Sequence, residues 1–161
     1  MIGRLSIWHR PGRKSFEALR ELGVTHIVTI LGEQEGAEKL IVSLKAAGFE
    51  SIWIPLGKGD PKTAISLADT IQERFLEVAK ALQSGGHVVV HCSAGIHRTG
   101  MLTYAFLRTI GMSRGEAEAA LGELRPITQE GVMASRLAGI EPLVDEIVSV
   151  PQPGAIEFVV I

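Results

Sequence analysis

The chain has 161 residues, one cysteine and a formal net charge of −2, so bulk electrostatics give no reason to expect a nucleic acid or an acidic membrane as its partner. The single cysteine, Cys92, excludes a disulfide within the chain, and no run of about 18 apolar residues predicts a membrane span. We expect one domain over residues 1–161, most simply a monomer in the cytoplasm, where thiols stay reduced.

In the first half of the sequence, β-branched runs alternate with amphipathic stretches. We expect, in chain order, a strand over 4–9, a helix over 15–22 capped by Ser15, a buried central strand over 25–31, a helix over 33–47 and a strand over 50–56. A loop over 57–61 then precedes a long amphipathic helix over 63–83. The basic cluster at Arg10, Arg13 and Lys14 is typical of a solvated turn.

The second half is dominated by helices. We expect a short strand before Cys92, a helix from Arg98, a capping-box helix from Ser113 to about residue 124, a loop around Gln129, and a helix over 132–148 interrupted at Pro142. The apolar tail over 151–161 is predicted to dock on the sheet edge. Together the elements indicate an α/β fold with a central, mainly parallel sheet flanked by helices.

Residues 91–100, HCSAGIHRTG, place Cys92 where a strand ends and Arg98 where a helix begins. The N–H groups of residues 93–98 have no strand partner, so in a curled loop they converge beside the sulfur, reinforced by the positive end of the helix. The planar fork of Arg98 adds donors that match two phosphoryl oxygens. The segment therefore predicts a phosphate-sized anion site with a thiolate nucleophile, Cys92, at its floor.

The same ten residues resemble the HCxxGxxR[ST]G signature of the cysteine-dependent protein tyrosine and dual-specificity phosphatases, with every fixed position occupied. The resemblance extends over about residues 20–140, and at low specificity outside the signature. It implies a phosphocysteine intermediate on Cys92, a supporting hydroxyl at Thr99, a loop buttress at His91, and no metal or organic cofactor. The phosphate-binding residues that it implies are Ser93, Ala94, Gly95, Ile96, His97 and Arg98.

A general acid that protonates the leaving oxygen is expected upstream of the nucleophile. Asp60 is the leading candidate, because it lies on a glycine-bounded loop 32 residues before Cys92 (92 − 60), a separation similar to that in many small dual-specificity phosphatases. It departs from several relatives by directly preceding Pro61, and Asp-Pro is also an ordinary turn pair. Glu33 and Glu35 are reserve candidates, although the preference of carboxylates for a helix N-terminus explains them better.

Three further residues are left with open roles. Gln129, 37 residues after Cys92 (129 − 92), resembles the water-positioning glutamine of large phosphotyrosine-specific enzymes, but the polarity of a helix N-terminus explains it as well. Arg125 either pairs locally or faces the substrate. His97 replaces a glycine common in phosphotyrosine-specific relatives, and it either narrows the mouth, contacts a second anion, changes charge near neutral pH, or faces solvent.

The predicted function is hydrolysis of phosphotyrosine, and to a degree phosphoserine or phosphothreonine, on a phosphorylated protein or peptide. The loop lacks the two lysines of phosphoinositide 3-phosphatases, which disfavours inositol lipids. The alternative is a phosphopeptide-binding module with little turnover, which requires that Asp60 is not the acid. Arsenate reductases and sulfurtransferases also use a thiolate and an arginine, but arsenate reduction usually requires a second thiol.

Overall fold

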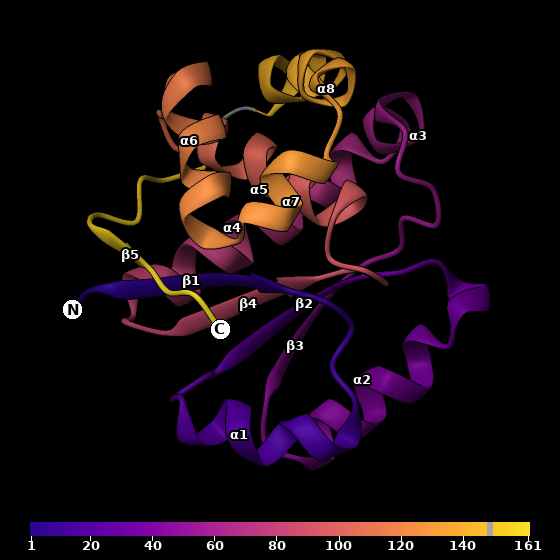
Figure 1. Ribbon diagram of the computed structural model, residues 1–161, viewed down its shortest axis with the longest axis vertical. Helices are drawn as coiled ribbons and strands as arrows, with labels where there is room; N and C mark the ends of the chain where they lie inside the picture. The colour runs from indigo at the N-terminus through magenta and orange to yellow at the C-terminus, as the bar shows by residue number, and fades with distance from the viewer. Residues whose placement is uncertain (148–149) are drawn as a thin grey trace.

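Five parallel strands form one sheet in the order β3-β2-β4-β1-β5 (Figure 1). The computed structural model describes residues 1–147 and 150–161. The strands are β1 (Gly3–Trp8), β2 (His26–Ile30), β3 (Glu50–Ile54), β4 (His87–His91) and β5 (Ile156–Phe158). All their carboxyl ends meet at one edge of the sheet, which is where α/β folds place their ligand sites. The predicted parallel α/β fold is confirmed.

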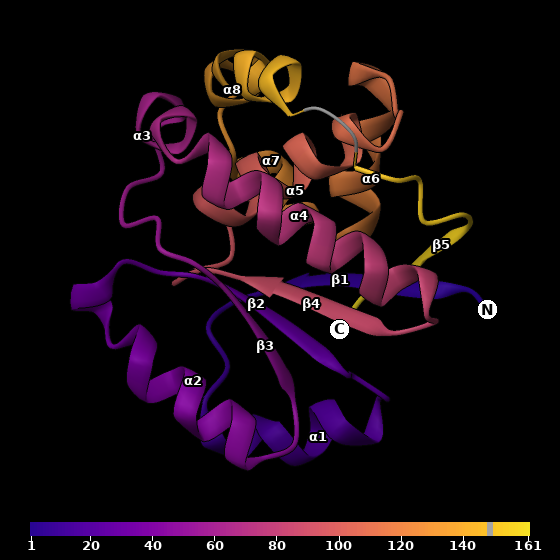
Figure 2. The ribbon, with the colours of Figure 1, turned by 180° about the vertical axis from the view of Figure 1, so that it is seen from behind.

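Helices cover both faces of the sheet (Figures 1 and 2). One face carries α1 (Phe16–Glu21) and α2 (Ala37–Ala46). The other carries α3 (Pro61–Ser66), α4 (Ala68–Gln83), α5 (His97–Thr109), α6 (Arg114–Leu124), α7 (Pro126–Gly131) and α8 (Ala134–Glu146). Because both faces are covered, every residue of the central strand β4 is buried.

Two of the predicted helices are divided in the structure. The segment predicted as one helix over 33–47 consists of a 3₁₀ turn, η2 (Glu33–Glu35), and α2, separated by Gly36 in the left-handed conformation at φ +77°. The segment predicted over 63–83 is divided at Leu67 into α3 and α4. Helix α3 begins earlier than expected because the Asp60 side chain caps it and Pro61 takes the first helical position.

The N-terminal helix also differs from its prediction. A 3₁₀ turn, η1 (Arg13–Ser15), precedes α1, and the Ser15 side chain makes no capping hydrogen bond. Ser15 has αR backbone angles, φ −89° and ψ −13°. An N-cap side chain reaches the N–H groups of its helix from an extended backbone, so the predicted Ser15 cap was wrong.

Two predictions about proline-containing segments were also wrong. The expected loop around Gln129 is helix α7, since Pro126 occupies the first helical turn, where its missing N–H is not needed. The expected interruption at Pro142 does not occur, and α8 continues through it to Glu146. Pro142 and Ala138, one turn earlier, are both exposed, so water can satisfy the carbonyl that proline leaves unpaired. The predicted end of this helix at residue 148 lies outside the described residues.

The C-terminal tail docks on the sheet edge, as predicted. Strand β5 pairs with β1, and beyond it the Val159 amide donates to the Leu5 carbonyl at 2.9 Å. The Ser6 hydroxyl donates to the Val159 carbonyl at 2.6 Å. In the part of the chain that the structure describes, no helix is both long and apolar enough to span a membrane.

Candidate active site

The loop between β4 and α5, here called the Cys92 loop (residues 92–96), turns its backbone carbonyls outward, away from the enclosed space. The acceptor and donor pairs are the Cys92 carbonyl with His91 Nδ1 (2.8 Å), Ser93 with the Arg10 amide (2.9 Å), Ala94 with Arg125 Nη1 (3.0 Å), Gly95 with Thr128 Oγ1 (2.6 Å) and Ile96 with the Gly100 amide (2.8 Å). In each peptide unit, the C=O and the N–H of the next residue point in opposite directions. The following amides therefore point to the inside of the loop, where they can bind an anion.

Gly95 is required at the tightest point of this loop. Its φ is +73°, and a Cβ on it would overlap the carbonyl of Trp8 at the end of β1. A side chain would therefore strain the backbone and push the loop off the sheet. The Gly95 carbonyl also accepts from Arg125 Nη1 at 3.0 Å, so the loop is held from β1 on one side and from α7 and its cap on the other.

The hydrogen bonds of His91 fix its tautomer. Nδ1 lies 2.8 Å from the Cys92 carbonyl, which can only accept, so Nδ1 carries the proton. Nε2 then accepts from the Thr29 hydroxyl at 2.9 Å. Burial lowers the pKa of His91 to about 4, so at neutral pH the ring is uncharged. His91 therefore supports the loop through a hydrogen bond to its backbone, not through a positive charge.

This buried histidine should make folding stability depend on pH. In the unfolded chain a histidine pKa is about 6.5, above the folded value of about 4, so the unfolded state binds more protons between these values. The stability that His91 contributes is present in full above about pH 6.5 and falls by roughly 3 kcal/mol as the pH drops to about 4. Burial also lowers the pKa of His87 and His26, which adds to the same trend.

Urea unfolding of the wild type and of His91→Gln across this pH range tests the assignment. We expect the variant to be less stable at neutral pH and to lose less stability on acidification, because it lacks the titrating ring. Equal slopes of unfolding free energy against pH in the two proteins would contradict the role given to His91.

Arg98 lies beside the Cys92 loop and is held by a carboxylate. Its Nη1 and Nη2 donate to the two oxygens of Glu35 at 2.6 and 3.0 Å, and Nη1 also donates to the Leu56 carbonyl at 3.0 Å. These bonds use the end of the guanidinium. The other side of the fork, Nε–H and the second Nη2–H, is left for the Cys92 sulfur, to which Arg98 also hydrogen-bonds, and for an anion in the loop. Arg98 is thus held by Glu35 in an orientation suited to binding a phosphoryl group.

Glu35 is ionised in this arrangement. The hydrogen bonds from Arg98, helped by the Gly32 amide at 2.6 Å, outweigh partial burial and lower its pKa. Both of its oxygens are bound, one by Arg98 and the Gly32 amide and the other by Arg98 again, so the geometry makes Glu35 a partner of Arg98 and not a reserve acid. Arg10, predicted to lie in a solvated turn, also belongs to the site, because its Nη1 donates to the Glu35 carbonyl at 2.6 Å.

Asp60 lies on the loop that runs from β3 to α3, here called the acid loop (residues 57–61). A Cβ placed on Gly59 would be 3.3 Å from His97 Cβ and 3.5 Å from Arg98 Cγ, so the acid loop touches the start of α5 directly. The Asp60 carboxylate accepts from the Thr63 amide at 2.8 Å and lies 2.7 and 2.9 Å from the Thr63 hydroxyl. The bonds from this hydroxyl, followed by the bond from the amide, lower the pKa of Asp60.

The sequence and the fold were compared with those of known proteins. The family model of the dual specificity phosphatase catalytic domain matches residues 11–134. The chain belongs to this family. No curated protein matches the sequence significantly, so the remaining comparisons rest on solved structures.

Solved phosphatases share the fold of this phosphatase domain. Tk-PTP, in a mutant form, aligns with a TM-score of 0.71 at 19% identity over 91% of this chain and 93% of its own. Kinase associated phosphatase, with its catalytic cysteine replaced by serine, gives 0.73 at 18% identity over 91% and 88%. PTPMT1 gives 0.67 at 24% identity over 88% and 91%.

Two other predicted site residues of the phosphatase domain, Thr99 and Gln129, make no hydrogen bond to the Cys92 loop that the structure shows. Thr99 Oγ1 is buried and has no hydrogen-bond partner among the described residues, so the supporting role of its hydroxyl stays a prediction. Gln129 is not brought to the loop. Its side chain lies against Gly122 of α6, where a Cβ would be 3.5 Å from Gln129 Cγ, and the predicted water-positioning role is not supported by a contact.

Several residues that hold the Cys92 loop and Arg98 have roles that were not predicted from the sequence. Thr128 and Arg10 carry no local pattern that distinguishes them from ordinary polar residues, Glu35 was predicted only as a reserve acid, and Arg125 was left open between two roles. The structure gives Arg125 a third role, as a donor to the Ala94 and Gly95 carbonyls. No group of three or more metal-ligating side chains occurs within residues 1–147 and 150–161.

Proposed function

We propose that this phosphatase domain hydrolyses phosphotyrosine, and to a lesser extent phosphoserine and phosphothreonine, in proteins through a phosphocysteine intermediate on Cys92. The observation that carries the proposal is the Cys92 loop, whose carbonyls are all bound from outside, with the free side of the Arg98 fork next to it. This arrangement offers inward amides and a cation to the three non-bridging oxygens of a phosphoryl group.

The proposed reaction has two steps. The Cys92 thiolate attacks phosphorus, an S–P bond forms, and the O–P bond to the substrate breaks as the leaving oxygen takes a proton from Asp60. A water molecule then attacks phosphorus, gives a proton to the Asp60 carboxylate, and releases inorganic phosphate as the S–P bond breaks. Because the Thr63 bonds lower the pKa of Asp60, we expect turnover of substrates with poor leaving groups to be highest at acidic pH.

Phosphate release from a phosphotyrosine peptide and a matched phosphothreonine peptide tests the proposal. The assay runs between about pH 4 and 8 without added metal, with Cys92→Ser as the control. We expect release that depends on Cys92, faster from phosphotyrosine, with a rate that falls as the pH rises and Asp60 loses its proton. Absence of release from both peptides would contradict the proposal.

A phosphopeptide-binding module is the second candidate, and one observation favours it. The Asp60 carboxylate is bound by Thr63 at the N-terminus of α3, and not by any group of the Cys92 loop. Tight binding of either phosphopeptide to the wild type without phosphate release would support this function.

The same assay should include a phosphoinositide monophosphate as a third substrate, because one of the similar solved structures is PTPMT1 in complex with PI(5)P. Ser93 and Ala94 of the Cys92 loop and His97 at the start of α5 are exposed, and none of them is a lysine. We therefore expect slower release from the lipid than from phosphotyrosine.

A further inference from the structure

The acid loop is enclosed between two helices. On one side Gly59 contacts His97 and Arg98 at the start of α5. On the other side is α8, which packs on α3 and α5 and contributes two residues to the contact, Arg136 and Gly139. The position of Asp60 relative to the Cys92 loop therefore depends on α8 as well as on the chain that connects them.

Arg136 contacts both the acid loop and the start of α5 with one guanidinium. Its Nε donates to the Gly59 carbonyl at 2.6 Å, and its Nη1 lies 3.4 Å from His97 Nδ1. A guanidinium can only donate, so His97 Nδ1 is the acceptor of this longer contact and the ring proton lies on Nε2. Arg136 thus joins the residue before Asp60 to the residue before Arg98.

Gly139 lies one turn after Arg136, on the same face of α8. A Cβ on Gly139 would be 2.7 Å from Pro61 Cγ and 3.1 Å from Pro61 Cβ, so α8 and the residue after Asp60 approach more closely than any side chain on α8 would permit. Arg136 and Gly139 therefore hold the acid loop on both sides of Asp60.

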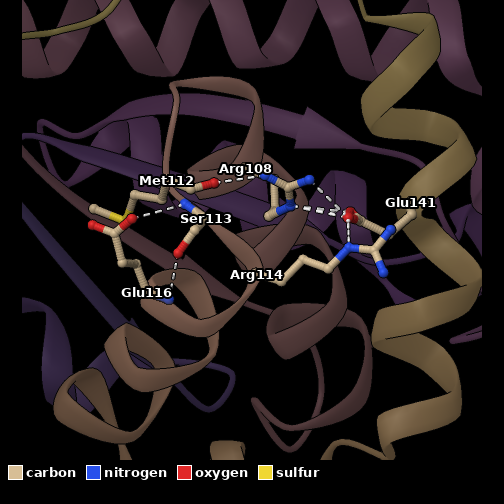
Figure 3. Close-up of polar contacts among 6 residues, drawn as sticks. All are labelled: Arg108, Met112, Ser113, Arg114, Glu116 and Glu141. Atoms are coloured by element: carbon tan, nitrogen blue, oxygen red, sulfur yellow. Dashed lines mark hydrogen bonds and ion pairs between the residues drawn. The ribbon is translucent and has the colours of Figure 1, made fainter.

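The same helix is fixed to the body of the domain by a buried carboxylate. Glu141 accepts from Arg108 of α5 at 2.8 Å and from Arg114 of α6 at 2.7 Å, and the two guanidinium groups converge on it from separate helices (Figure 3). Arg108 also donates to the Met112 carbonyl at 2.7 Å, which ties the end of α5 to the start of α6. This network anchors α8 two residues from Gly139, so the helix can act as a rigid support.

We propose that α8 seats the acid loop, with Arg136 as the positioning residue that sets Asp60 relative to the Cys92 loop. The catalytic part of this inference rests on the proposed function, since it assigns Asp60 as the proton donor. A displaced Asp60 delays protonation of the leaving oxygen without changing attack by sulfur. The effect of Arg136 should therefore appear only with substrates whose leaving group needs a proton.

Two aryl phosphates, one with a low-pKa and one with a high-pKa leaving group, separate these effects. We expect Arg136→Ala to lower kcat by roughly 10- to 100-fold on the high-pKa substrate and by less than about twofold on the other. Arg136→Lys, which keeps one donor, should recover part of the loss. In an Asp60→Asn background, Arg136→Ala should have no further effect. Equal losses on both substrates, or additive losses with Asp60→Asn, would overturn the assignment.

Hydrogen exchange tests the seating without reference to catalysis. Arg136→Ala and Gly139→Ala should each speed amide exchange in the segment 57–66, the second by pushing Pro61 away. Gly115→Ala is the matched control, because it is also a helical glycine but has nothing within 4 Å of the added Cβ. Unchanged exchange in both α8 variants would overturn the seating. If the wild type releases no phosphate, the proposed function fails while the exchange result still decides whether α8 holds the loop.

Discussion

Replacing Cys92 with serine is expected to lower kcat on the order of 10⁶-fold, the scale of losing the nucleophile in other hydrolases that form covalent intermediates. A serine hydroxyl is a much weaker acid than a thiol and stays protonated, and no group in the loop is placed to remove its proton. The loop itself should survive, because its bonds to His91, Arg10, Arg125 and Thr128 all go to backbone carbonyls. Phosphate release and phosphate binding, measured on the same preparation, check the two halves of this expectation.

The phosphate-binding measurement shows whether the Cys92→Ser variant still forms the loop. If Cys92→Ser neither turns over nor binds inorganic phosphate, the variant has lost the loop and tells nothing of the nucleophile, so Cys92→Ala provides a second test. Robust release by either variant would show that the sulfur does not attack phosphorus.

Replacing Arg98 with lysine is expected to reduce kcat/KM by about 10³-fold while the protein still folds. An ammonium is a single point charge and cannot bind Glu35 with two parallel bonds while donating two more to a phosphoryl group. Steady-state kinetics on an aryl phosphate with a low-pKa leaving group measures the loss without interference from the acid. A reduction below about tenfold would mean that the fork does not bind the transferring phosphoryl group.

Glu35→Gln is the companion to this substitution. The amide keeps one acceptor oxygen for Arg98 but loses the charge and the second acceptor, so its loss of activity should be smaller than that of Arg98→Lys. Because the two residues act as a pair, the double variant should be little worse than Arg98→Lys alone. Additive losses would assign Glu35 a separate function.

The sequence predicts best the placement of residues whose relation is local. Cys92 and Arg98 are six positions apart, Cys92 directly after a buried strand and Arg98 in the first turn of a helix, so the turn between them brings both to one end of the sheet regardless of the rest of the chain. The parallel sheet was predictable for a similar reason, because short β-branched runs separated by helices leave little choice of connection.

The roles that were missed join residues from distant parts of the chain. Glu35 is 63 positions from Arg98, Thr128 is 33 from Gly95, and Arg136 is 77 from Gly59. Each is an ordinary polar residue of a helix or turn, and only tertiary packing selects it. Gln129 shows the converse: its spacing suggested a role, but α7 presents Thr128 to the loop and places Gln129 against α6.

The outward-facing carbonyls of the Cys92 loop tie anion affinity to the cooperativity of folding. Their partners come from β4, α5, α7 and the segments that follow β1 and α6, so the cradle exists only when the N-terminal part of the sheet and the C-terminal helices are both in place. An oxyanion that binds there stabilises the whole domain through mass action, by about 2.7 kcal/mol at a hundred times its dissociation constant. The thermal midpoint in the presence of phosphate thus reports the integrity of the site in any variant, including those that no longer turn over.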